Sequence, residues 1–206
     1  MNKIIDHPLI KNKLTRMRNI STKANYFRDL LKEITALMMY EVARDYPLKE
    51  IEIETPLTKM TGYTLKNDIV IVPILRAGLG MADGVSDVIP GAKIGHIGLY
   101  RNESSLQPVE YYAKFPQNMK NADVIVLDPM LATGGSATKA ISIIKKLQPR
   151  SIQFVGLVGA RQGLTILNEM HPDVNVYLAA LDEKLNDLGY IEPGLGDAGD
   201  RLYGTK

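Results

Sequence analysis

The 206 residues are 45% apolar and 23% charged, which is typical of one well-packed globular domain, and we expect a single domain over residues 1–206. The 25 Lys and Arg residues and 23 Asp and Glu residues leave a net charge of +2, which is too small to indicate a nucleic-acid or membrane partner. Because the chain has no cysteine, disulfides, thiolate metal sites and cysteine nucleophiles are excluded.

The N-terminal segment contains no apolar run of secretory length. No stretch of the sequence approaches the roughly 18 apolar residues that a membrane span needs. We therefore expect a soluble protein of the cytoplasm, and the absence of cysteine fits a reducing compartment.

The first predicted element is one long amphipathic helix. Its apolar residues recur at steps of three and four from Tyr26 to Val42. Ser21-Thr22 provides a cap signal before it, and Pro47 marks the end of the pattern. We interpret the apolar stripe as core or subunit packing rather than as a ligand site.

Strand patterns begin at residue 51. Residues 51–54 alternate between apolar and charged, as a half-buried strand does, whereas residues 69–72 are continuously apolar, as a buried parallel strand is. Further strand patterns lie at 124–127, 152–155 and 174–178, and helical patterns at 78–88, 136–147 and 164–170. This alternation predicts βαβ units, so we expect an α/β fold with a mainly parallel sheet flanked by helices.

Two segments do not follow this alternation. Polar turns and short strands over residues 99–117 predict a hairpin or lid. After Leu185 the chain carries five glycines and one proline between residues 189 and 204, so we expect this tail to be loop.

A glycine-rich segment joins the strand at 124–127 to the next helix, at the end of the strand where α/β proteins bind ligands. Its adjacent glycines allow a tight turn in which main-chain N–H groups and the hydroxyls of Thr133 and Ser136 converge on one anion at the helix N-terminus. We expect this turn to bind a phosphate monoester, and Asp128 to accept hydrogen bonds from sugar hydroxyls. A tight turn with a capping serine is the alternative interpretation.

A second candidate lies where the strand at 69–72 ends. Arg76 follows apolar residues there and precedes Ala77-Gly78, which permit close approach of the backbone. A guanidinium group donates two parallel hydrogen bonds to a phosphate or diphosphate. An ordinary surface arginine is the alternative.

Four segments, in this order, resemble the uracil phosphoribosyltransferase family, which has the type I phosphoribosyltransferase fold. Pro73 to Gly78 is similar to the family's diphosphate loop, and Tyr100-Arg101-Asn102-Glu103 to the start of its mobile lid. Residues 128–136 resemble its phosphoribosyl-diphosphate loop, and residues 189–201 resemble its uracil-binding tail, which distinguishes it from relatives that act on purines or orotate. Ala160-Arg161-Gln162-Gly163 departs from the Pro-Glu-Gly expected before the following helix.

The resemblance implies transfer of a 5-phosphoribosyl group from phosphoribosyl diphosphate to uracil, giving UMP and diphosphate. It implies catalytic roles for Arg76, Arg101, Asp128 and Asp197, and Mg²⁺ that arrives on the sugar diphosphate, near Asp197, without direct protein ligands. The implied donor-binding residues are Arg76, Arg101, Asp128, Pro129, Met130, Leu131, Ala132, Thr133, Gly134, Gly135, Ser136 and Asp197. The implied uracil-binding residues are Ile191, Gly196, Asp197 and Ala198, mainly through main-chain groups, in a C-terminal base-binding loop region.

Other interpretations are weaker. Residues 194–199 match the pattern GxGxxG, but we expect no dinucleotide site because they follow no strong strand, open no predicted helix and lie too close to the C-terminus. A phosphoribosyltransferase for another base, and a regulator that senses phosphoribosyl diphosphate and binds RNA, are the two rivals. The tail motif opposes the first, and the near-neutral charge opposes the second. The resemblance further implies a homo-oligomer, a dimer or tetramer, and GTP as an effector in some members.

Overall fold

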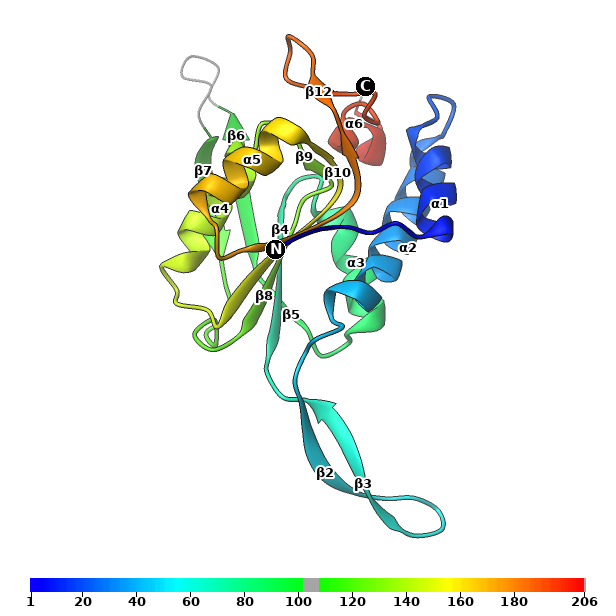
Figure 1. Cartoon of the computed structure of the whole chain (residues 1–206), viewed down its shortest axis with the longest axis vertical. Helices are drawn as coiled ribbons and strands as arrows, with labels where there is room; N and C mark the ends of the chain where they lie inside the picture. Colours follow the sequence, from blue (N-terminus) through cyan, green and yellow to red (C-terminus); the bar gives the residue numbers. More distant parts are fainter. Residues whose placement is uncertain (102–107, 206) are drawn as a thin grey trace.

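The continuously apolar runs of the sequence lie side by side in the middle of one sheet, in a computed structural model that describes residues 1–101 and 108–205 (Figure 1). There β4 (Ile69–Leu75), β8 (Asp123–Leu127) and β10 (Ser151–Ala160) pair in parallel. Nearly all their residues are buried, because helices cover both faces of the sheet.

The full sheet has the strand order β1, β11, β10, β8, β4, β6, β7. Its outer strands are β1 (Asn2–Ile4), β11 (Asn175–Asp182), β6 (His96–Arg101) and β7 (Pro108–Lys114). Two short strands, β5 (Lys93–Ile94) and β9 (Met130–Leu131), add to β4 and β10. Among the described pairs of this sheet only β6 with β7 is antiparallel, so the predicted mainly parallel α/β fold is confirmed.

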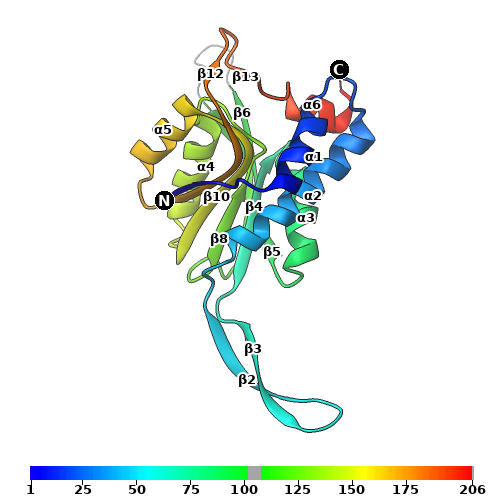
Figure 2. The same ribbon diagram turned by 45° about the vertical axis from the view of Figure 1, so that its right-hand side comes forward.

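Alternate residues of the central strands pack into two separate cores, one on each face of the sheet. Ile69 and Ile71 face α1 (Pro8–Arg18), α2 (Ala24–Val42) and α3 (Leu79–Val88). Val70 and Val72 face the opposite core, which includes α4 (Gly135–Lys145) and α5 (Arg161–Met170) (Figure 2). This period of two is what a strand buried on both sides requires.

The predicted long helix is confirmed as α2, whose apolar stripe is buried against the sheet and its neighbouring helices. Its predicted cap is wrong. The residue before the helix is Lys23, and no side chain caps it, while the Thr22 hydroxyl instead donates to the carbonyl of Arg16 at 2.6 Å. Helix α1 was not predicted; it begins after His7, whose Nδ1 accepts a hydrogen bond from the N–H of Leu9.

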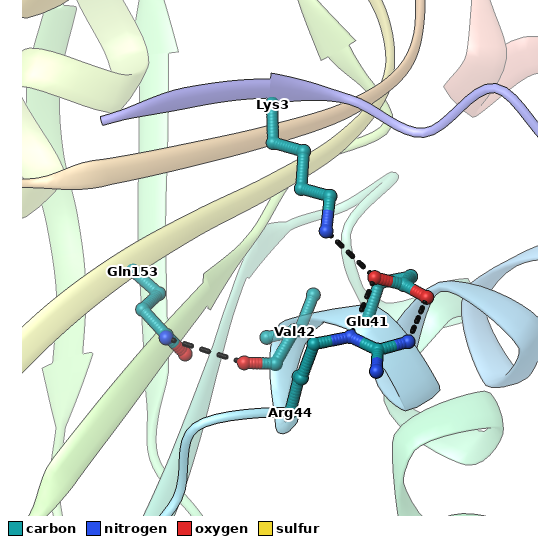
Figure 3. A network of polar contacts seen from close by, with 5 residues as sticks. All are labelled: Lys3, Glu41, Val42, Arg44 and Gln153. Carbon is teal, nitrogen blue, oxygen red and sulfur yellow. Dashed lines mark hydrogen bonds and ion pairs between the residues drawn. The ribbon is translucent and has the colours of Figure 1, made fainter.

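A polar network fixes the C-terminal end of α2 against the sheet (Figure 3). The Glu41 carboxylate accepts hydrogen bonds from Arg44 Nη2 at 2.5 Å and Lys3 Nζ at 2.6 Å, and these bonds lower its pKa to about 2. From β10, the Gln153 amide donates to the carbonyl of Val42 at 3.4 Å. The network therefore joins β1, α2 and β10, which are distant in sequence.

Strands β2 (Leu48–Glu54) and β3 (Lys59–Leu65) form an antiparallel hairpin that projects from the end of the molecule opposite α6 (Ala198–Tyr203) (Figure 1). Every residue of β2 is exposed, so the predicted half-buried strand is wrong. A two-stranded ribbon has no second layer of its own to cover its apolar side chains.

The tail is more regular than predicted. Its β13 (Ile191–Glu192) pairs with β12 (Lys184–Leu185), which lies just before the tail, and α6 follows, so the expectation of loop throughout is wrong. The expectation that the glycine pattern opens no helix is also wrong, since α6 begins within it. Positive φ angles at Gly189, Gly194 and Gly196 explain how a glycine-rich segment takes one compact path.

The remaining predicted helices are confirmed with shifted ends, and α5 begins three residues before the predicted residue 164. Strands β6 and β7 confirm the hairpin predicted within residues 99–117. Asn102, Glu103 and the side chain of Arg101 lie outside the described residues, so the lid stays a prediction. Within the described ranges, no helix combines the length and apolar character that crossing a bilayer requires.

Candidate active site

A cavity of about 330 Å³ lies at the carboxyl ends of β4 and β8, under the C-terminal tail. Three segments that are separate in the sequence meet in it: the turn after β4, the loop after β8, and the tail. The lining residues are Ala77, Asp128, Met130, Ala132, Leu188, Gly189, Tyr190, Ile191, Gly196, Asp197, Ala198 and Gly199. The sequence-predicted sugar and base residues therefore share one cavity.

The turn after β4 packs directly on the end of β8. A Cβ at Gly78 would lie 2.3 Å from the carbonyl oxygen of Leu127 and 2.7 Å from that of Ile74, so only glycine fits. This close approach holds the turn, and with it Arg76, next to the loop that begins at Asp128. The peptide bond between Leu75 and Arg76 is cis.

Arg76 is not one of the residues that line the cavity, but it lies beside it, since its Nη2 is 4.0 Å from where a Cβ of the cavity-lining Gly199 would be. Its side chain is 61% exposed. Its guanidinium nitrogen is 3.8 Å from the Asp200 carboxylate and its guanidinium carbon is 5.9 Å from the centre of the Tyr203 ring. The Tyr203 hydroxyl donates to the main-chain carbonyl of Arg76 at 3.1 Å. The arginine thus faces α6 and solvent, where a charged ligand in the cavity can reach it.

Asp128 follows β8 and lines the cavity, half-buried. Burial raises the pKa of its carboxyl group to about 7, and the N–H of Met130 donates to Oδ1 at 3.3 Å, which partly offsets that effect. A carboxyl group with few protein partners in a protected cavity is prepared to accept hydrogen bonds from a ligand.

The glycine turn lies beside the cavity lining rather than in it, since Thr133, Gly134, Gly135 and Ser136 are not among the lining residues, and it leads into the uncapped N-terminus of α4. Gly134 has φ +82°, in the left-handed region, and precedes α4, which no side chain caps. The Thr138 hydroxyl shares its one hydrogen between the carbonyls of Gly134 and Gly135, each 2.9 Å away. Ser136 lies within the first turn of α4 and is exposed, so the alternative interpretation as a capping serine is wrong.

The loop rests on the start of α5. A Cβ at Gly163 would lie 2.3 Å from the carbonyl oxygen of Ala132, so this glycine is required by the turn beside it. Arg161 and Gln162, where the sequence departs from the family pattern, are both exposed. The departure at Arg161 and Gln162 therefore leaves the contact between Gly163 of α5 and the loop at Ala132 intact.

The tail presents main-chain groups to the cavity. Ile191, Gly196 and Ala198 all line it, as the sequence predicts for base binding. Asp197 also lines it, and its Oδ1 accepts a hydrogen bond from the N–H of Asp200 at 2.8 Å, which caps α6 and orients the carboxylate.

Sequence reasoning missed the side chains that hold the tail in place. Arg201 donates to the carbonyl of Leu195 at 2.8 Å and of Asn19 at 2.7 Å, and its guanidinium carbon lies 4.6 Å from the centre of the Phe27 ring. Arg18 reaches the same tail from α1. Apart from the contact of Arg201 with Leu195, the partners are more than 160 residues apart, so no local sequence pattern could reveal these contacts.

Histidines do not contribute to the cavity lining. His7 caps α1, and Nε2 of His171 lies 3.2 Å from the Ser142 hydroxyl and 3.0 Å from the carbonyl of Thr138, so both side chains have structural partners. In the part of the chain that the structure describes, no group of three or more His, Asp or Glu side chains is arranged to hold a metal ion.

Comparison with known proteins gives a consistent result. The model of the family "Uracil phosphoribosyltransferase" matches residues 4–205. A uracil phosphoribosyltransferase of Ureaplasma parvum serovar 3 is 63% identical over the full length of both chains. A solved structure from Aquifex aeolicus is 41% identical, with a TM-score of 0.96 over 100% of this chain and 99% of that one. A purine phosphoribosyltransferase from Pyrococcus horikoshii, 19% identical over 75% of this chain and 84% of its own, has the same fold at a TM-score of 0.53.

Proposed function

The chain belongs to the uracil phosphoribosyltransferase family, and from this premise we propose how its cavity binds the two substrates. The reaction transfers the 5-phosphoribosyl group of phosphoribosyl diphosphate to uracil and releases diphosphate. Two charges must be managed: positive charge that develops at the anomeric carbon, and negative charge on the leaving diphosphate.

The loop over residues 128–136 binds the phosphoribosyl group. The N–H groups at the start of α4, together with the Thr133 and Ser136 hydroxyls, surround the 5′-phosphate, and the helix dipole adds to the attraction. The uncapped helix N-terminus and the left-handed Gly134 support this assignment. Asp128 accepts hydrogen bonds from the ribose hydroxyls, which its position in the cavity supports.

Arg76 and Arg101 bind the diphosphate and stabilise it as it leaves. The exposure of the Arg76 side chain beside the cavity supports its part. Mg²⁺ carried on the sugar diphosphate would neutralise further charge there, and it would need few protein ligands because it keeps several waters. Asp128 and Asp197 line the cavity, and their carboxylates would hold the hydrated ion through its waters.

Uracil lies against the main chain of Ile191, Gly196 and Ala198. Main-chain N–H and carbonyl groups match the O4 acceptor and the N3 donor of uracil, a pattern that cytosine reverses. A mismatched base leaves a buried main-chain group unpaired, at a cost of roughly 1–3 kcal/mol per contact, or about tenfold to hundredfold in discrimination. The inclusion of these residues in the same cavity as Asp128 supports this placement.

The convergence of the three segments on one cavity is the observation that carries the proposal. The test is to incubate the purified protein with phosphoribosyl diphosphate and Mg²⁺ and to offer uracil, cytosine, hypoxanthine and orotate in turn. We expect UMP to be the dominant product. Preference for another base would reject the base-binding assignment, and RNA binding that weakens steeply with salt would favour the regulator instead.

Three further parts of the proposal concern assembly, regulation and location. A homo-oligomer, a dimer or tetramer, is supported by the β2–β3 hairpin, which exposes Leu57 and Tyr63 at 94% and 65%. Sedimentation analysis tests it. GTP as an activator rests on the family resemblance, and rate measurements with added GTP test it. A cytoplasmic location rests on the absence of cysteine and of an apolar run long enough to span a membrane, and cell fractionation tests it.

A further inference from the structure

One buried ion pair holds the base-binding tail at its tightest turn. Arg18, at the end of α1, donates from its two terminal nitrogens to the two carboxylate oxygens of Asp182, at 2.7 and 2.8 Å. Asp182 ends β11 and is 8% exposed, and the Arg18 side chain is 23% exposed. The two groups form a bidentate pair, an arrangement that adds geometric specificity to the attraction between the charges.

Both members of the pair also bind the main chain of Gly194. Arg18 donates to the Gly194 carbonyl at 2.6 Å, and the Gly194 N–H donates to Oδ2 of Asp182 at 2.9 Å. The carbonyl of Gly194 is therefore bound by Arg18, and its N–H by Asp182, the other member of the ion pair. The contacts span 176 and 12 residues of sequence, so they join α1, β11 and the tail.

The position of Gly194 determines the shape of the base-binding loop. Its φ is +57°, and a Cβ there would lie 2.0 Å from the carbonyl oxygen of Ile191, so the chain turns back tightly on itself. Ile191 before this turn and Gly196 after it both line the cavity. A displacement of Gly194 would move the main-chain groups on both sides of it.

We propose that the Arg18–Asp182 pair is a positioning device that sets the spacing of the uracil-binding main-chain groups, and so the affinity for the base. This inference rests on the proposed function. Neither side chain lines the cavity, so neither contacts substrate. Buried ion pairs contribute little net stability, because desolvation offsets their attraction, but they fix geometry. Binding through directional hydrogen bonds is sensitive to displacements of about 1 Å.

The side chains of the ion pair make no polar contact with the donor-binding loop, residues 128–136. Their polar partners are Gly194 and each other. A positioning role therefore predicts a selective effect: KM for uracil changes and KM for phosphoribosyl diphosphate does not. A general loss of folded protein would change kcat and leave both KM values alone.

The test compares Arg18→Lys and Arg18→Met with Arg44→Lys in the full-length protein. Lysine keeps the charge but cannot place two nitrogens on one carboxylate. We expect KM for uracil to rise at least about tenfold in Arg18→Met, the effect of losing one aligned hydrogen bond, and by a smaller factor in Arg18→Lys. KM for phosphoribosyl diphosphate stays within about twofold of wild type.

Arg44→Lys is the matched control, since Arg44 makes a similar two-nitrogen contact with Glu41, away from the cavity (Figure 3). It should leave both KM values unchanged. If Arg18→Met does not fold, Arg18→Lys and Asp182→Asn carry the test, because both retain part of the contact. An unchanged KM for uracil in folded variants, or equal rises in both KM values, would overturn the inference. A wild-type protein that does not use uracil would instead reject the proposed function.

Discussion

Replacing Asp128 by asparagine should stabilise the protein at neutral pH while it impairs catalysis. Burial raises the pKa of this carboxyl group from 3.8 to about 7. Between these two values the folded state holds a proton that the unfolded state has lost. The free energy of unfolding therefore falls as pH rises through this interval, and the cost is fully present above pH 7. Asparagine has nearly the same shape and no charge, so it avoids that cost.

The magnitude follows from the width of the interval. Where the folded state binds one proton more than the unfolded state, the free energy of unfolding falls by about 1.4 kcal/mol per pH unit. The interval of about three units gives an upper bound of roughly 4 kcal/mol, and water in the cavity reduces it. The advantage of the Asp128→Asn variant should be absent below about pH 4, grow toward pH 7 and be constant above it.

Urea unfolding followed by circular dichroism, at half-unit steps from pH 4 to 8 and one protein concentration, measures this difference. Glu41→Gln is a suitable comparison, because the pKa of Glu41 is lowered to about 2 and its contribution varies only at acid pH. In the same variants, turnover should fall about tenfold or more for Asp128→Asn, since a neutral amide binds the ribose hydroxyls less strongly. A stability difference that is constant with pH would refute the reasoning about Asp128.

Three other predictions concern the remaining parts of the site. Arg76→Ala should lower kcat about a hundredfold with little change in uracil affinity, because the proposed partner of Arg76 is the leaving diphosphate. Steady-state kinetics measures kcat and calorimetry measures uracil affinity, and equal losses of the two would count against that role. Gly163→Ala should raise KM for phosphoribosyl diphosphate and lower the free energy of unfolding by roughly 1–3 kcal/mol, because its Cβ would lie 2.3 Å from the Ala132 carbonyl. Gln162→Ala, at an exposed neighbour, is the control and should have no effect. Finally, amide hydrogen exchange in β6 and β7 should slow when phosphoribosyl diphosphate binds, and unchanged exchange there would reject the lid.

The sequence predicts the centre of the fold well because its signal there is local. Continuously apolar runs such as residues 69–72 identify strands buried on both faces, and the helices between them require parallel pairing. Ligand residues at the ends of such strands then meet at one edge of the sheet. This is why Ala77 and Asp128, 51 positions apart in the sequence, line one cavity.

The parts that could not be predicted depend on what lies opposite each element. The alternation at residues 51–54 indicates a strand with one apolar face, but not whether anything covers that face, and here β2 is exposed. The glycines of the tail indicate turns, yet the ion pair of Arg18 with Asp182 that shapes those turns joins residues 164 positions apart. Helix α1 could have been predicted, because its buried residues Ile10, Leu14 and Met17 recur at steps of four and three and Pro8 stands at its start.

A crystal structure of the protein with UMP tests the central claim most directly, because the product occupies both the phosphate and the base positions. We expect the 5′-phosphate to lie against the N–H groups of residues 133–136, the ribose hydroxyls at Asp128, and the uracil edge against the main chain of Ile191 and Gly196. A phosphate bound elsewhere, or a base that points away from the tail, would contradict it.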